Sequence, residues 1–527
     1  MELNEIVVST TVGDSVSSST PLSTCSVHEV AVVICYFVLA LASGIYSSTS
    51  GFVLNQKNVI LPNYDETEAA RLLPRDRNTV ARLGNVVESE LESQQQISHS
   101  QRTSNFATLM HLLKGNIGTG ILAMPNAVSN AGLLVGSVGI PILGVICVHC
   151  MHLLVISSKT LARKIGCTSL DYSGTAEQAF RLGPARVQKY AMVARQAVNT
   201  MLMLTQFGFC CVYFLFVSKS LYEVCKNLIG YSPIGPKAYM GILLPFMILF
   251  NFIRNLKKLS PASALANVLQ SVGLIMVLYY LLQGHQSTNL DVYTSSLSKL
   301  PLYFGTAMYA FEGIGVVLPL ENAMATPEDF GGLNGVLNTG MVVVACLYTG
   351  VGFYGYLKYG NDVKSSITFN LPQNAVSEVI RLMFALAIFL SYALQLYVPL
   401  SIIWPFLKRK FDIERFSEKD QLLMELLLRT VLVIITFMVA ISIPLLDLFI
   451  SLVGALASSS LALIFPPIIE LCCVWNTNIS RRKLCLITIK NFLIACFGCI
   501  GCVIGTYTAV SEIIFCLQNP EDAKCAS

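Results

Sequence analysis

The sequence predicts an all-α polytopic membrane protein with about eleven transmembrane helices. Of its 527 residues, 54% are hydrophobic and only 13% are charged, and the mean hydropathy is +0.63. Soluble domains carry roughly 25% charged residues. A second observation is a series of apolar runs of about 20 residues, the length at which a helix crosses a bilayer. The third is that glycine and proline interrupt two of these runs.

The apolar runs follow one another between residues 105 and 513, which we take as one transmembrane domain. An N-terminal tail, 1–104, precedes it, and a short C-terminal tail, 514–527, follows it. The expected spans lie near residues 105–127, 131–156, 191–222, 239–253, 261–283, 299–321, 336–357, 377–404, 424–443, 446–471 and 487–513.

Lys and Arg residues are concentrated on one of the two alternating sets of connections. That set includes residues 159–189, 254–258, 408–419 and 481–483. Because cytosolic loops carry the excess of basic residues, this set is predicted to be cytosolic, with the C-terminus on the outer or lumenal face. A net charge of +4 over this length gives no indication of nucleic-acid binding.

The N-terminal tail has two parts. Residues 53–104 are polar with mixed charges and are expected to be mostly disordered and cytosolic. Within them Glu68 stands four positions before Leu72 and Leu73, a spacing that resembles acidic dileucine signals read by endolysosomal sorting adaptors, although such short patterns also arise by chance. Residues 30–46 form an apolar run at the lower limit for spanning, so a twelfth span stays open.

The first interrupted span contains the sequence LLKGNIGTGILAMP, residues 112–125. Glycine and proline at this density break a helix. A break at bilayer depth leaves backbone groups without helical partners, at several kcal/mol each, so such breaks tend to line binding sites. The alternative is that the glycines only let two helices pack closely.

The second interrupted span, KLPLYFGTAMYAFEGIGVVLPLEN over residues 299–322, has Glu312 beside Gly313 and Gly315. Two interrupted spans are typical of secondary transporters. A charged side chain at a helix centre costs roughly 2.5 to 3.5 kcal/mol and usually faces a cavity or a partner. Glu312 is therefore expected either to meet a substrate or a proton, or to tie the broken helix to backbone or to a basic residue such as Lys114.

These segments also carry a family resemblance. Together with AMPNAVSNAG, VHCMHLLV, TQFGFCCVYFLF, FIRNLKKLSPASALAN and SITFNLP, they make the chain from about Phe106 to Ser511 similar to proton-coupled amino acid transporters of the amino acid/auxin permease group. The resemblance implies a fold with a five-helix inverted repeat, in which helices 1 and 6 are the broken pair.

A free amino acid is a zwitterion, so its site needs donors for the carboxylate and acceptors for the ammonium group. The freed amides of the first break and a half-helix N-terminus suit the carboxylate, and carbonyls of the second break suit the ammonium group. The predicted substrate-binding residues are Ile117, Gly118, Thr119, Gly120, Phe311, Glu312 and Gly313. Phe311 acts either as a thin gate or as plain packing.

His149 lies inside the second span, where its reference pKa of about 6.5 suits proton relay. A lone histidine in a span is more often a packing residue, but the resemblance implicates this position in proton coupling. Glu312 is the other candidate proton carrier, because it is a charged residue at the middle of a span. Tyr213, Tyr392 and Gln395 are polar-tipped residues of spans 3 and 8 that are candidates for the cavity lining.

The expected function is proton-coupled symport of small neutral amino acids, of the glycine, alanine and proline class, by alternating access. No catalytic constellation, metal motif or cofactor is predicted, and protons are the coupling ion. Two alternatives stay open. One is sodium-coupled or facilitative transport, for which Ser458, Ser459 and Ser460 are possible ligands. The other is an amino acid sensor with a nutrient-signalling complex as partner. Lysosomal, endosomal and plasma membranes are all compatible.

Overall fold

The computed structural model describes residues 102–230, 234–254, 256–284, 286–293, 296–475 and 479–519. Within them the secondary structure is helical, apart from one isolated parallel bridge between Thr103 and Met324. The predictions for the tail, namely the run 30–46, the disorder of 53–101 and the sorting motif of Glu68, Leu72 and Leu73, lie outside the described residues. So does most of the C-terminal tail.

In the described part of the chain, nine helices are long and apolar enough to cross a membrane. A shorter apolar helix, α9, and the first span, which is split in two, bring the number of spans to eleven. In order, these spans are α3 (Asn105–Asn116) with α4 (Thr119–Ala131), α5 (Leu133–Ile165), α8 (Ala191–Ile229), α9 (Pro236–Asn251), α10 (Leu256–Leu282), α11 (Leu300–Ala310) with α12 (Ile314–Ala323), α13 (Val336–Tyr359), α14 (Ala375–Lys410), α15 (Glu418–Ser442), α16 (Leu446–Val453) with α17 (Phe465–Trp475), and α18 (Arg481–Gln518). They coincide with the predicted spans.

Spans that are five apart in the sequence pack against each other. α4 packs on α11, α5 on α13, α8 on α14 and α9 on α15. These pairs join the first span to the sixth, the second to the seventh, the third to the eighth and the fourth to the ninth. The predicted five-helix repeat with a broken first and sixth helix is confirmed, and α18 follows the second repeat and packs on α11, α16 and α17.

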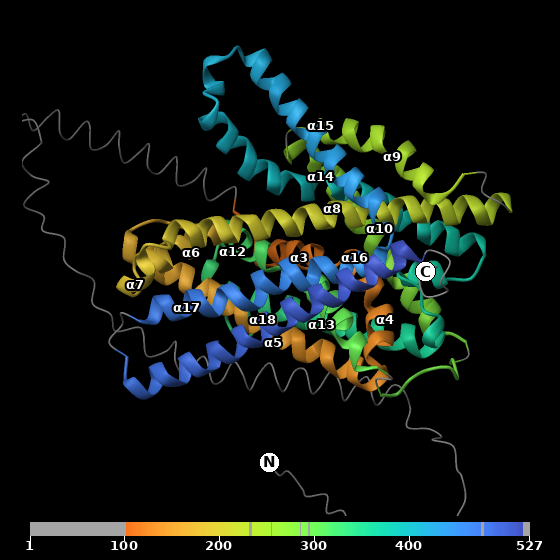
Figure 1. The fold of residues 1–527 in the computed structure, drawn as a ribbon, viewed down its shortest axis with the longest axis horizontal. Coiled ribbons are helices and arrows are strands. Elements are labelled where there is room, and N and C mark those ends of the chain that lie inside the picture. Colours follow the sequence, from red (N-terminus) through yellow and green to blue (C-terminus); the bar gives the residue numbers. More distant parts are fainter. Residues whose placement is uncertain are drawn as a thin grey trace, which may run out of the picture.

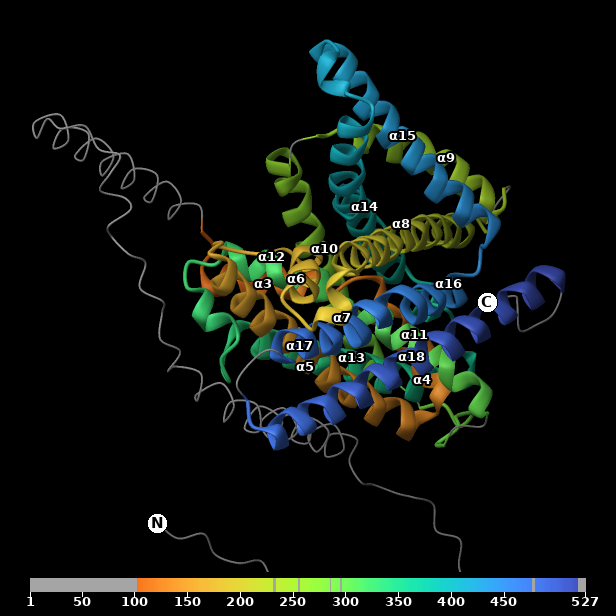
Figure 2. The ribbon, with the colours of Figure 1, turned by 60° about the vertical axis from the view of Figure 1, so that its left-hand side comes forward.

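The long helix α8 runs through the middle of the molecule (Figures 1 and 2). α9 and α15 lie together on one side of it, whereas α5, α13 and α18 lie on the other side. The short helices α6 (Tyr172–Arg181) and α7 (Ala185–Gln188) connect α5 to α8 at one end of the bundle. The broken helices α4 and α11 pack against each other, and α4 also packs on α5 and α13.

The tenth span departs from α-helical geometry in its middle. Between α16 and α17 it passes through two π-helical stretches, Gly454–Ser458 and Ser460–Ile464. Gly454 presses on α11 so closely that an added Cβ would lie 1.9 Å from the carbonyl oxygen of Gly305. The wider turn accommodates this close approach, and π-helical turns inside helices occur frequently at functional sites.

Candidate functional site at the two helix breaks

The first break is short. α3 ends at Asn116 and α4 begins at Thr119, with an extended backbone at Ile117, whose N–H still donates to Leu113 O over 2.8 Å. Gly118 precedes α4 and offers no side chain to cap its first amides. The N-terminus of α4 therefore presents free backbone donors, which is the arrangement that attracts a carboxylate.

The second break spans three residues. α11 ends at Ala310 and α12 begins at Ile314. Phe311, Glu312 and Gly313 lie between them, and the Gly313 N–H donates to Phe311 O over 2.8 Å. The two breaks meet, because the Asn116 side chain packs on the α-carbon of Gly313, where an added Cβ would lie 2.8 Å from both Nδ2 and Oδ1 of Asn116.

The glycines of the first break have different surroundings. At Gly120 an added Cβ would lie 2.7 Å from the α-carbon of Ala310, so this glycine is pressed against α11. At Gly118 the nearest atom to an added Cβ is the hydroxyl of Tyr213, at 3.9 Å. A methyl group would therefore fit beside Gly118 without a clash, whereas Gly120 serves the close packing of the two broken helices.

Two of the three candidate lining residues are close to that space. Gln395 Nε2 of α14 donates to the hydroxyl of Tyr213 on α8 over 3.1 Å, and this pair faces Gly118. Tyr392 instead forms a 2.7 Å hydrogen bond with Thr436 of α15. The hydroxyl of Tyr392 is therefore engaged away from the breaks.

Hydrogen bonds from two tyrosines connect the broken helices. The hydroxyls of Tyr309 and Thr119 lie 2.8 Å apart, joining α11 to α4. The hydroxyl of Tyr348, on α13, donates to Ala310 O at 2.7 Å and is also within hydrogen-bonding reach of Asn116 O. Phe311 is fully buried with its ring centroid 5.1 Å from that of Tyr348. In this conformation the predicted gate residue is packed beside the breaks.

Glu312 is buried, and its Oε2 makes no hydrogen bond to any described residue. The Ser458 hydroxyl, in the first π-helical stretch, is also buried and interacts with the Glu312 carboxyl, although the two make no hydrogen bond of regular geometry. Lys114, considered as a partner for Glu312, donates instead to Ser263 O over 3.4 Å. A carboxyl group with an unpartnered oxygen in the centre of the membrane domain is suited to proton binding.

His149 lies on α5 and is also buried, with its Nε2 unpartnered among the described residues. None of the hydrogen bonds and close contacts found among the described residues joins His149 to the two breaks. The structure brings the seven predicted binding residues together at the breaks and leaves His149 on the neighbouring helix α5.

The end of the bundle predicted to be cytosolic is closed by several contacts. The Lys159 Nζ lies 2.6 Å from Glu321 Oε1, which joins α5 to α12. Backbone hydrogen bonds connect Thr103 to Ala323 and Ala325. Side-chain hydrogen bonds from Asn105 and Thr326 to Asp329 hold the pKa of this carboxyl below its usual value. The segment before the first span is thus fixed to the connection that follows the sixth.

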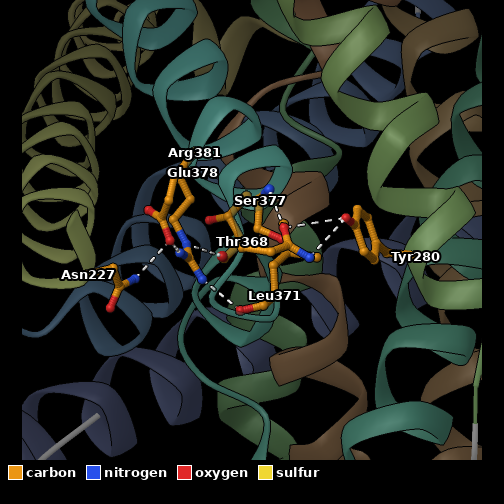
Figure 3. A network of polar contacts seen from close by, with 8 residues as sticks. Asn227, Tyr280, Thr368, Leu371, Ser377, Glu378 and Arg381 are labelled. Carbon is orange, nitrogen blue, oxygen red and sulfur yellow. Dashed lines mark hydrogen bonds and ion pairs between the residues drawn. The ribbon is translucent and has the colours of Figure 1, made fainter.

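The opposite end is closed by a network around Arg381 of α14 (Figure 3). The buried guanidinium donates to Thr368 O at 2.9 Å and to Leu371 O at 2.7 Å, and it pairs with Glu378. Asn227, near the end of α8, donates to the same carboxylate over 2.9 Å. These contacts hold the connection between α13 and α14 over the outer ends of the third and eighth spans.

Two residues of the site carried no signal in the sequence. Asn116 lies within the glycine-rich segment but is a polar residue with no spacing to mark it, and Tyr348 is one aromatic among many in an apolar span. Only the three-dimensional meeting of α3, α11 and α13 shows that both contact the breaks.

Comparisons with known proteins agree with this architecture. The family described as "Transmembrane amino acid transporter protein" matches residues 101–511. The "Proton-coupled amino acid transporter-like protein pathetic" of Drosophila melanogaster is 36% identical over 421 residues, covering 80% of this chain and 87% of that protein. The "Probable amino acid transporter skat-1" of Caenorhabditis elegans is 27% identical over 424 residues, covering 78% and 91%.

Two solved structures also align with the chain. MhsT in complex with L-phenylalanine has a TM-score of 0.43 at 14% identity, covering 76% of this chain and 98% of MhsT. Mhp1 in its inward-facing conformation has a TM-score of 0.47 at 11% identity, covering 80% and 92%.

Proposed function

This chain belongs to the transmembrane amino acid transporter family, and from that premise we propose that it moves small neutral amino acids across a membrane together with protons. The observation that carries the proposal is the meeting of two broken helices beside Glu312, a buried carboxyl group with an unpartnered oxygen. Free amides at the start of α4, buried carbonyls of the second break and a titratable group are then close together.

The substrate is proposed to bind beside Gly118. Its carboxylate would accept hydrogen bonds from the amides of Gly118, Thr119 and Gly120 at the start of α4, where the helix dipole is positive. The amide of Ile117, also predicted as a donor, is already engaged by Leu113 O. Carbonyls at Phe311 and Gly313 would accept from the ammonium group. The Tyr213 hydroxyl stands close to Gly118, which limits the space for a substrate side chain and supports the glycine, alanine and proline class.

Protonation of Glu312 is the proposed coupling event. An ionised carboxylate with an unpartnered oxygen is costly inside a membrane domain, so Glu312 favours a proton in this buried position. A proton bound from the acidic side would neutralise Glu312 during the conformational change and leave on the other side. His149 of α5, whose Nε2 is buried without a partner among the described residues, is proposed as a second coupling residue.

A second candidate function is nutrient sensing. The specific observation in its favour is the backbone pairing of Thr103 with Ala323 and Ala325, which connects the end of the N-terminal tail to the sixth span. A conformational change at the breaks would in this way be transmitted to the N-terminal tail. The tail would then recruit sorting adaptors or a signalling complex at a lysosomal, endosomal or plasma membrane.

The test is uptake of radiolabelled alanine into liposomes that contain the purified protein, under an imposed pH gradient, with and without sodium. We expect the pH gradient alone to drive accumulation. Glu312→Gln should abolish proton-driven accumulation but retain exchange of alanine for alanine, and His149→Ala should weaken accumulation. Glu512→Gln, at an exposed position of α18, is the matched control.

Two outcomes would contradict the proposal. Uptake that ignores the pH gradient would exclude proton coupling. If none of glycine, alanine and proline is transported into the liposomes while at least one of them binds to the protein, the sensing function is favoured over transport.

A further inference from the structure

The C-terminal ends of two helices, α3 and α11, lie close to each other at the breaks. Asn116 is the last residue of α3, and Ala310 is the last residue of α11. The last carbonyl groups of a helix lack partners within that helix and form the negative end of its dipole. In broken transporter helices, such carbonyls are suited to coordinating a sodium ion or a proton.

Here a side chain occupies the point where the two carbonyls converge. Tyr348 is fully buried, and its hydroxyl is within hydrogen-bonding reach of both Asn116 O and Ala310 O. The 2.7 Å between the hydroxyl and Ala310 O is the length of one O–H···O hydrogen bond, which leaves no space for a metal ion between these atoms.

A third oxygen lies in the same region. Asn116 Oδ1 is buried and makes no hydrogen bond to any described residue, while Nδ2 of the same side chain donates to Leu112 O over 2.9 Å. The region around the Tyr348 hydroxyl is therefore rich in oxygen acceptors and poor in donors. The single proton of that hydroxyl serves one of the two carbonyls at a time.

We propose that the Tyr348 hydroxyl takes the place of a monovalent cation between the two breaks and so makes transport independent of sodium. The inference deepens the proposed function, on which it rests, by naming the residue that excludes the competing coupling ion. The hydroxyl belongs to a side chain of α13, so it stays between the ends of α3 and α11 whether or not substrate is bound. A sodium ion in the same position would have to arrive and leave in each cycle.

Tyr348→Phe tests this directly, because it removes only the hydroxyl and keeps the ring beside Phe311. The variant takes the hydroxyl donor away from Asn116 O and Ala310 O, beside the Asn116 Oδ1 that has no donor in the wild type either. In choline buffer we expect alanine uptake by this variant to fall about tenfold, since unsatisfied buried carbonyls disfavour the joined state of the breaks. Sodium should restore most of the loss, whereas the wild-type rate should be the same in both buffers.

Tyr303→Phe is the matched control. Tyr303 is a buried residue of α11 whose hydroxyl also donates to a backbone carbonyl, that of Gly136, over 2.9 Å. This variant also loses a buried tyrosine hydroxyl, but one that does not contact the breaks, so sodium should not alter its uptake.

A binding measurement keeps the inference separate from transport. In detergent, sodium chloride should raise the thermal unfolding midpoint of Tyr348→Phe above its value in choline chloride, and it should not do so for the wild type or for Tyr303→Phe. If Tyr348→Phe shows the same uptake and the same midpoint in both salts, the inference is wrong. Wild-type uptake without proton dependence would instead defeat the proposed function, and the midpoint comparison would still decide the role of Tyr348.

Discussion

Lys159 Nζ lies 2.6 Å from Glu321 Oε1, and this ion pair joins the second span to the end of the broken sixth span. The Glu321 side chain is 3% exposed, whereas that of Lys159 is 34% exposed. Lys159 also donates to Pro327 O over 3.0 Å, in the connection that follows α12. Lys159 thus contacts both α12 and the connection that follows it, at the end of the bundle predicted to be cytosolic.

Lys159→Met is expected to open this end of the protein. The substitution leaves a buried carboxylate unpaired, at a cost of about 3 kcal/mol in the closed state. Thermal unfolding in detergent should show the loss, and the double variant Lys159→Met/Glu321→Gln should recover part of it, because the orphaned charge is then removed. The matched control is Asp412→Asn, which breaks an ion pair with side chains 66% and 82% exposed and should change stability by less than about 0.5 kcal/mol. Equal effects of the two single variants would show that Glu321 is not held by Lys159.

Substitution of Gly120 by alanine should lower the stability of the protein, whereas substitution of Gly118 by alanine should leave it unchanged. Gly120→Ala places a Cβ 2.7 Å from the backbone of Ala310, and overpacking of this kind costs about 1 to 3 kcal/mol. Gly118→Ala meets only the Tyr213 hydroxyl at 3.9 Å, so the protein should stay as stable as the wild type.

If the substrate binds beside Gly118, its alanine variant should raise the KM for alanine uptake while the unfolding midpoint is unchanged. The paired measurement of KM and midpoint on both variants separates a packing glycine from a binding glycine. An unchanged KM in Gly118→Ala would place the substrate elsewhere.

Arg381→Met should destabilise the outer end of the bundle by about 3 to 5 kcal/mol. The variant removes the ion-pair partner of the buried Glu378 carboxylate. It also removes the donors for the carbonyls of Thr368 and Leu371. Thermal unfolding measures the loss, with Arg482→Met at an exposed position as the control. The double variant Arg381→Met/Glu378→Gln should be more stable than Arg381→Met alone. The opposite order would mean that the carbonyl contacts, and not the ion pair, dominate.

Much of the fold follows from simple sequence patterns. The spans were predictable because apolar runs of sufficient length have few other uses, and the two breaks were predictable because glycine and proline cluster where a helix should be regular. The burial of Glu312 was likewise implied by a charge at the middle of a span.

Other features of the site depend on contacts between distant segments. The hydroxyl of Tyr348 reaches carbonyls that lie 232 and 38 positions away in the chain, and no local pattern encodes that approach. The close approach of Gly454, in the π-helical part of the tenth span, to α11 is likewise a property of the packed bundle.

The short parallel bridge between Thr103 and Met324 has a mechanical consequence. α3 and α12 are held to each other at that bridge and again where Asn116 packs on Gly313. The twelve residues of α3 separate these two attachments by about 18 Å. Because the two half-helices are attached to each other at both ends, they should move together as one rigid unit about the helix breaks at Gly118 and Phe311.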